Sequence, residues 1–263
     1  MTEDIWQHLD EWLSKGGYPL EMQVARHFRD ARWRVVQAEF YTDPDTQTSR
    51  EIDLVAYRQA DFDGRVVRMS LVVECKSTSR NPWVLFTDGS IRLPEGEQVT
   101  QNAASHYGTI VLRELSKVAS FANLQMFQLP ERPGYALREA FGGKADNAYK
   151  AVMSVTNAVA ALSKEVGAVA EIMFQMVVIE GRLFECYLKE DNQPTFGEVN
   201  GGVLVWRRPV AQRPYAFVKV VTTAGLAELV GNADLAVTEL LAHGKRIEQA
   251  VGRRARKPGN RRE

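Results

Sequence analysis

Apolar residues recur at helical spacing in several separate segments of the chain. Residues 3–15 and a segment from Pro19 to about Ala31 each carry an apolar stripe, and proline suits the first turn of a helix. Residues 145–166 place apolar residues on one face at steps of three and four. These patterns predict three amphipathic helices. Further helices are expected at about 97–120, 224–230 and 234–250.

Runs rich in β-forming residues lie between these helices. Three strands are expected in the first third of the chain, at 33–41, 50–58 and 66–76. The Asp63-Gly64 dipeptide between the last two is a strong hairpin signal. A second hairpin is expected around Glu180-Gly181, with strands at 172–179 and 183–188. Two further strands are expected at about 202–206 and 215–222. Strands that alternate with helices in this way indicate an α/β protein.

The Asp63-Gly64 turn determines which residues of the first hairpin lie opposite one another. If the loop is symmetric about these two residues, the numbers of paired positions sum to 127. One face of the hairpin is then wholly apolar, with Ile52 opposite Cys75, Leu54 opposite Val73 and Ala56 opposite Leu71. A slip of one residue would turn every side chain to the other face, so a structure tests this register directly.

The second face of the hairpin carries charges. The same register places Asp53 opposite Glu74 and Glu51 opposite Lys76, next to a pair of valines. Two carboxylates that face each other destabilise a sheet, and partial burial increases the cost. A divalent cation offsets this repulsion, because hard oxygen ligands suit Mg²⁺. We therefore expect Asp53 and Glu74 to bind Mg²⁺, with Lys76 close enough to act on a metal-bound water.

A third acidic residue comes from the second helix. Glu21 precedes Val24, Ala25 and Phe28 by three, four and seven positions, which are same-face spacings. Its side chain therefore follows the apolar stripe, and a helix packed on the sheet could bring it toward Asp53. The simpler alternative is that an acidic residue in the first turn stabilises the helix dipole.

Together these residues resemble the motif of the PD-(D/E)XK nuclease superfamily. The resemblance covers about the first 86 residues and rests on Glu21, Arg50-Glu51-Ile52-Asp53 and Glu74-Cys75-Lys76. It implies a restriction-endonuclease-like αβββαβ core with a mixed sheet flanked by helices. The helix at 145–166 and the strand at 172–179 would complete this core. Ile52 stands where the motif's name has proline, a position at which the superfamily often departs from the motif.

The resemblance also implies a mechanism. Asp53, Glu74 and the backbone carbonyl of Cys75 would hold Mg²⁺, or Mn²⁺ in its place. Lys76 would orient the attacking water and help to deprotonate it, and Glu21 would bind a second metal ion or a metal-bound water. The implied activity is hydrolysis of phosphodiester bonds in DNA, in restriction, phage defence or repair. A homodimer would supply two active sites for cutting both strands.

Other functions remain open. A catalytically silent nuclease fold could serve as a DNA-binding or scaffold subunit of a multi-component system. A metal enzyme of this kind could also act on RNA or on a small phosphodiester. At the level of residues, Asp53, Glu74 and Lys76 could simply form a half-exposed strand face with an ordinary ion pair between Glu51 and Lys76.

Length and composition narrow the class of protein. The 263 residues include 45% hydrophobic and 25% charged residues, which are ordinary values for a globular chain and exclude disordered and collagen-like classes. We expect a single restriction-endonuclease-like domain over residues 1–251. Within it, the motifs lie in 17–86, a variable insertion spans about 87–143, and 144–251 supplies the remaining sheet and helices.

Charge and cysteine usage add two expectations. The formal net charge is zero, but residues 245–263 hold eight basic and two acidic residues, which could contact DNA phosphates. The last part of this segment, 252–263, is expected to be disordered. Cys75 and Cys186 lie in apolar runs, which indicates a reducing compartment. Because the sequence shows no signal-peptide pattern and no apolar run of roughly 20 residues, we expect a cytoplasmic protein without membrane contact.

Overall fold

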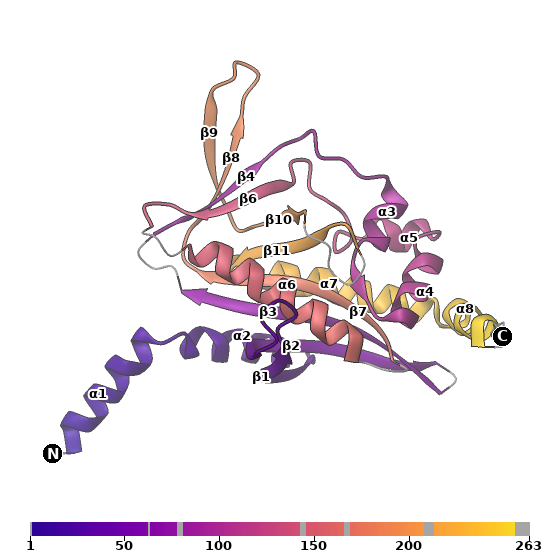
Figure 1. Ribbon diagram of the computed structural model, residues 1–263, viewed down its shortest axis with the longest axis horizontal. Coiled ribbons are helices and arrows are strands. Elements are labelled where there is room, and N and C mark those ends of the chain that lie inside the picture. The colour runs from indigo at the N-terminus through magenta and orange to yellow at the C-terminus, as the bar shows by residue number, and fades with distance from the viewer. Residues whose placement is uncertain are drawn as a thin grey trace.

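The computed structural model describes residues 2–62, 64–77, 81–142, 146–165, 169–207 and 213–255. These residues form one 11-stranded mixed sheet with helices packed against both faces (Figure 1). The α/β class and the helix-flanked mixed sheet are therefore as predicted. None of the helices within these ranges is long and apolar enough to cross a membrane.

The elements alternate along the chain. The first half contains α1 (Thr2–Lys15), α2 (Tyr18–Asp30), β1 (Arg34–Thr42), β2 (Ser49–Phe62), β3 (Arg65–Ser77), β4 (Trp83–Thr87), α3 (Glu95–Thr100), β5 (Ala103–Ala104), α4 (His106–Leu115), α5 (Ala119–Ala122) and β6 (Gly134–Glu139). The second half contains α6 (Asn147–Glu165), β7 (Ala170–Glu180), β8 (Leu183–Leu188), β9 (Pro194–Val199), β10 (Gly201–Trp206), β11 (Ala216–Thr222), the 3₁₀ turn η1 (Thr223–Gly225), α7 (Leu226–Ala242) and α8 (Gly244–Ala255). The strand order across the sheet is β1-β2-β3-β7-β11-β10-β6-β4-β8-β9, and β5 pairs with β7.

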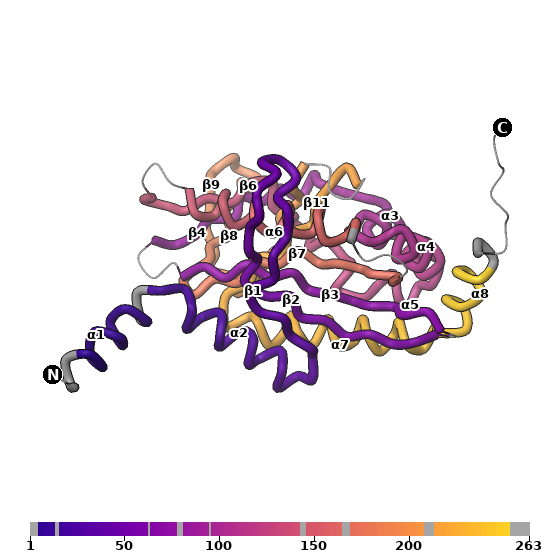
Figure 2. The backbone as a smooth tube through the Cα atoms, turned by 60° about the horizontal axis from the view of Figure 1, so that its bottom comes forward, coloured from indigo at the N-terminus to yellow at the C-terminus, as the bar shows by residue number. Residues whose placement is uncertain are grey.

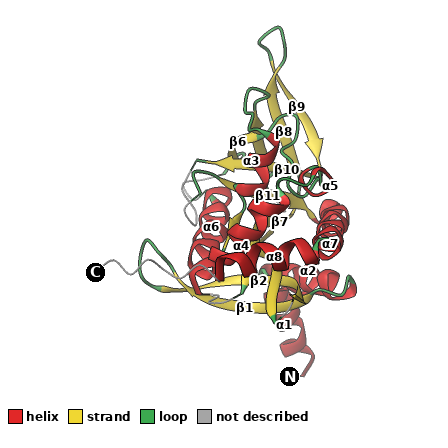
Figure 3. Ribbon diagram, turned by 90° about the vertical axis from the view of Figure 1, so that its right-hand side faces the viewer, coloured by secondary structure: helices red, strands yellow, loops and turns green. Residues whose placement is uncertain are grey.

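Two apolar cores lie on opposite faces of the central strands β3, β7 and β11. The first packs α2, α4, α5, α7 and α8 on one face, and Phe28, Val73 and Val230 belong to it. The second packs α6 on the other face through Val155, against Val72 and other buried residues of the strands. Figure 3 shows α6 and α7 on the two sides of the sheet. The alternation of β3 therefore sends neighbouring residues to different helices.

The register of the first hairpin is confirmed from its turn up to the middle of the strands. The β2–β3 ladder runs from Phe62 opposite Arg65 to Leu54 opposite Val73, so the numbers of the paired residues sum to 127 throughout. Gly64 has a φ of 76°, which is the left-handed conformation that glycine tolerates without strain. Asp63 itself lies outside the described residues.

Beyond Leu54 the predicted pairing is wrong. Ile52 packs into the core beneath α6, whereas Cys75 packs into the core beneath α2. The cause lies in β1, where the ladder with β2 pairs Gln37 with Leu54 and resumes with Glu39 and Ile52. Ala38, between them, has a left-handed backbone with a φ of 57°. The strand therefore turns about Asp53, and residues on its two sides face different cores.

The outer part of the β1–β2 hairpin leaves the sheet at this point. In Figure 2 its tip rises across α6, while β3 continues along β7. The pairing agrees, because β2 continues with β1 as far as Ser49 opposite Thr42, and β3 continues with β7 as far as Ser77 opposite Glu180. The strands β2 and β3, which were expected to stay paired, therefore separate beyond Leu54 and Val73. We call this point of separation the fork.

Several predicted elements need correction. The helix expected at 97–120 is divided into α3, α4 and α5, with the short strand β5 between the first two. The hairpin expected around Glu180-Gly181 does not form among the described residues, because β7 pairs with β3, β5 and β11 while β8 pairs with β4 and β9. The helix break expected near 231–233 lies instead between α7 and α8. Residues 252–255 belong to α8, and 256–263 lie outside the described residues.

The backbone of Ala38 gives a test of the fork. Ala38 is exposed, so a change there acts through conformation rather than packing. A β-branched residue is strongly disfavoured at positive φ, so Ala38→Val should lower the free energy of unfolding by about 1–3 kcal/mol. The matched variant Ala38→Gly should leave it unchanged or raise it by up to about 1 kcal/mol. Urea denaturation measures both, and equal stability of the two variants would contradict the assignment.

Candidate active site

The site begins where β2 and β3 separate. At the fork the backbone N–H of Cys75 donates a hydrogen bond to Oδ2 of Asp53, at 2.6 Å. A side-chain carboxylate thus takes the place of the β2 backbone as partner for β3. This contact fixes the Asp53 carboxylate beside β3 at Cys75, the residue between Glu74 and Lys76 in the sequence.

Glu74 is held on the face that α6 covers. Only 6% of the residue is exposed, and its Oε2 accepts a hydrogen bond from Oγ of Ser154 at 2.7 Å. Its Oε1 forms an ion pair with Nζ of Lys76. The Lys76 side chain is 32% exposed, so the ammonium lies where the buried pair meets solvent. The prediction that Lys76 pairs with Glu51 is wrong, because the β2–β3 ladder ends before it reaches either residue.

Glu21 approaches the same group of charges from α2. The residue is half-buried in the first turn of the helix. Burial raises the pKa of its carboxyl, and the charges of Asp53 and Glu51 raise it further. The Lys76 ammonium lowers the pKa of Glu21, and Glu74 adds to its rise. These effects on the pKa are consistent with the predicted approach of Glu21 toward Asp53. Glu21 also lies in the first turn of α2, near the positive end of the helix dipole.

The acidic residues of the fork are costly to ionise. Burial raises the pKa of Asp53 and outweighs the lowering effects of the Cys75 N–H and of Lys76. Burial and the neighbouring charge of Asp53 raise the pKa of Glu74. Burial alone would lower the pKa of Lys76, but the carboxylates of Glu74 and Asp53 outweigh it and raise this pKa. One lysine thus only partly balances the buried carboxylates.

The predicted donor set suits a hard cation in its chemistry. Asp53 and Glu74 offer carboxylate oxygens, the ligands that Mg²⁺ prefers, and their mutual repulsion is the kind that a divalent cation relieves. Glu74 already contacts Lys76 and Ser154 through its two oxygens, so a metal ion would use the remaining lone pairs. Within the described part of the chain, no group of three or more His, Cys, Asp or Glu side chains is arranged to hold a metal ion.

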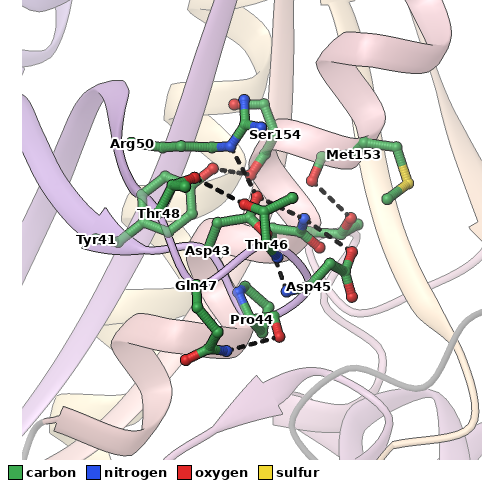
Figure 4. Close-up of polar contacts among 12 residues, drawn as sticks. Tyr41, Asp43, Pro44, Asp45, Thr46, Gln47, Thr48, Arg50, Met153 and Ser154 are labelled. Carbon is green, nitrogen blue, oxygen red and sulfur yellow. Dashed lines mark hydrogen bonds and ion pairs between the residues drawn. The ribbon is translucent and has the colours of Figure 1, made fainter.

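Sequence reasoning missed a set of polar residues that holds the hairpin tip against α6 (Figure 4). Tyr41 donates a hydrogen bond from its hydroxyl to the carbonyl oxygen of Ser154 at 3.3 Å. Asn157 donates from its amide to Asp43 Oδ2 at 3.1 Å, and Nε of Arg50 lies 3.0 Å from the same oxygen. The sequence signal for this contact was a pair of polar residues three positions apart, Ser154 and Asn157, within a mostly apolar stretch of the helix. Ser154 and Asn157 therefore join the site to the hairpin tip.

Asp43 differs from Asp53 in its electrostatics. It is only 4% exposed, and burial alone would raise the pKa of its carboxyl. Hydrogen bonds from the Thr46 backbone and the Asn157 amide outweigh burial, so the pKa is lowered. The protein thus stabilises one buried aspartate as an anion and leaves another in an environment that opposes ionisation.

Comparison of the chain with protein-family models, curated proteins and solved structures finds no match.

Paired substitutions of the two aspartates test this electrostatic difference. Asp53→Asn removes a poorly balanced charge and keeps an oxygen for the Cys75 N–H. In the presence of chelator at pH 7 it should stabilise the protein by roughly 1 kcal/mol, or about 2–4 °C in Tm. Asp43→Asn removes a buried charge that hydrogen bonds stabilise, and it should destabilise the protein by about 1–3 kcal/mol. Thermal unfolding measures both, and a loss of stability in Asp53→Asn would show that Asp53 is a structural anion.

Proposed function

We propose that the chain is a Mg²⁺-dependent nuclease that hydrolyses phosphodiester bonds in DNA, with Asp53, Glu74 and Lys76 as its catalytic residues. The observation that carries the proposal is the group of poorly balanced carboxylates with one lysine at the fork. The group lies near the carboxyl end of β3, which is parallel to β7 and β11. Ligands of α/β sheets bind at this end of the strands.

Each residue has a separate part in this proposal. Asp53, Glu74 and the backbone carbonyl of Cys75 would hold Mg²⁺ or Mn²⁺, and Glu21 would bind a second ion or a metal-bound water. When bound, the metal supplies Lewis-acid stabilisation of the phosphate charge and a more acidic water. Lys76 would orient that water, because its ammonium is kept beside Glu74 at the solvent-facing side of the site. Ser154 would position Glu74 through its hydrogen bond.

The order of elements supports the proposal. In the chain, α2, β1, β2 and β3 precede α6 and β7, and the corresponding strands lie side by side as β1-β2-β3-β7. This is the αβββαβ order that the resemblance to PD-(D/E)XK nucleases implies, with α2 and α6 on opposite faces of the sheet. A restriction-endonuclease-like core, a role in restriction, phage defence or repair, a homodimer and a cytoplasmic location belong to the same proposal.

A DNA-binding subunit without catalysis is the second candidate. One observation favours it, namely that both carboxylate oxygens of Glu74 already have partners within the protein. A site that had lost its metal would be expected to satisfy its own acids in this manner. The two candidates predict the same fold and differ only in cleavage.

A plasmid-nicking assay tests the proposed activity. The full-length protein should convert supercoiled DNA to open or linear forms with Mg²⁺ or Mn²⁺, and chelator should abolish the reaction. Asp53→Asn, Glu74→Gln and Lys76→Met should each reduce the rate by roughly 10²-fold or more. Glu171→Gln is the matched control, because Glu171 is also a buried carboxylate but contacts Arg68 and Ser70 at the opposite end of the central strands. It should keep its activity.

The other outcomes separate the alternatives. DNA binding without cleavage by either metal would favour the non-catalytic subunit. Cleavage that is inhibited by RNA far more than by competitor DNA would favour an RNA substrate. Cleavage that survives in Glu74→Gln and Lys76→Met would place the activity elsewhere.

A further inference from the structure

A buried lysine, Lys219, lies in the middle of β11. Its partners across the strands are Val203 of β10 and Met176 of β7, and both are apolar. The next residues on its own face of the strand are Phe217 and Val221, which are buried as well. Lys219 is 8% exposed, so its long side chain is enclosed by hydrophobic neighbours. Lysine is one of the residues least often found in such a position.

Among the residues that the structure describes, none forms a hydrogen bond or an ion pair with the Lys219 ammonium. Within those residues its pKa is affected by burial alone, which lowers it to about 8. Glu171, a similarly buried charge, instead contacts both Arg68 and Ser70. A largely buried ammonium without a partner costs free energy, and an anionic ligand would offset this cost.

Lys219 lines a cavity of about 520 Å³ between the β10–β11 pair, the start of α7 and the segment 125–130. This volume is within the range of small-molecule sites. The polar residues that line it, besides Lys219 and Glu228, include four residues with side-chain amides, namely Gln125, Gln128, Asn200 and Asn232. The apolar part consists of Met126, Leu129, Pro130, Val203 and Leu229 together with valines of β11. The cavity thus combines one buried lysine, several amide-bearing residues, an apolar wall and one carboxylate at Glu228.

We propose that this cavity binds a small organic anion, a carboxylate or phosphate monoester on an apolar body, with Lys219 as its charge partner. The anionic group would lie against the ammonium, the amides would bind its remaining oxygens, and the apolar body would pack on Met126 and Leu229. Glu228, an exposed residue of α7, also lines the cavity.

The cavity is separate from the proposed nuclease site. Met176 and Val221, which flank Lys219, belong to the core on the α7 face of the sheet. Glu74 instead contacts Ser154 of α6, on the other face. The proposal therefore stands or fails without reference to DNA cleavage.

Thermal unfolding with matched probes tests the proposal. Benzoate and phenyl phosphate present the two anionic groups on one apolar ring, and benzyl alcohol is their neutral counterpart. At least one anion should raise the Tm of the full-length protein by about 5–10 °C at one hundred times its Kd. Benzyl alcohol should have little effect. The response to the anion should be lost in Lys219→Met and retained in Lys150→Met, which removes an exposed lysine of α6.

Amine labelling gives a second measurement on the unmodified protein. Acetylation at pH 8, with the modified lysines identified by mass spectrometry, should modify Lys219 and be slowed at least tenfold by the stabilising anion. If Lys219→Met does not fold, protection of Lys219 in the wild-type protein decides the question. A larger effect of benzoate or of phenyl phosphate identifies the anionic group. The proposal is overturned if neither anion raises the Tm or protects Lys219, or if benzyl alcohol matches them and Lys219→Met responds like the wild type.

Discussion

The hydrogen bond from the Cys75 N–H to Asp53 is the contact on which the proposed site depends. A strand that leaves its neighbour exposes backbone groups that must be satisfied elsewhere. Here the Asp53 carboxylate satisfies the amide of β3, while β3 keeps its full pairing with β7 on the other side. The hairpin partner can therefore leave the sheet without opening the core. The same contact places a carboxylate beside Glu74, and the cost of that proximity is what a cation would relieve.

The helix α6 holds both the fork and the tip of the β1–β2 hairpin in place. Ser154 contacts Glu74, and Asn157, one turn later, contacts Asp43 at the tip of the β1–β2 hairpin. The fork and the tip are therefore held by one helix, although Asp43 and Asp53 lie ten residues apart in the sequence. A displacement of α6 would move both, so the position of Glu74 relative to Asp53 depends on the packing of α6 as much as on the strands.

The sequence predicts the parts of this arrangement that depend on local rules. The β2–β3 register near the turn follows from the turn and the alternation of side chains, so the pairing as far as Leu54 and Val73 could be predicted. The fork could not be foreseen, because alanine at position 38 gives no signal for a left-handed backbone. The hairpin expected after β7 failed for another reason. Nearly every residue of β7 is buried, and a strand buried on both faces pairs with distant strands rather than with its neighbour in sequence.

Other buried charges of the protein have partners, unlike Lys219 and, in part, the acidic residues at the fork. Glu171 is 2% exposed but contacts Ser70 and Arg68, and Asp43 is surrounded by amide donors and Arg50. The chain thus compensates buried charges where they serve structure. The acidic residues at the fork and Lys219 are exceptions. The fork carries excess negative charge on one face of the sheet, and Lys219 places an unpaired positive charge on the other. Departures from an otherwise consistent core are expected where binding requires them, and each departure here suits a ligand of the opposite sign.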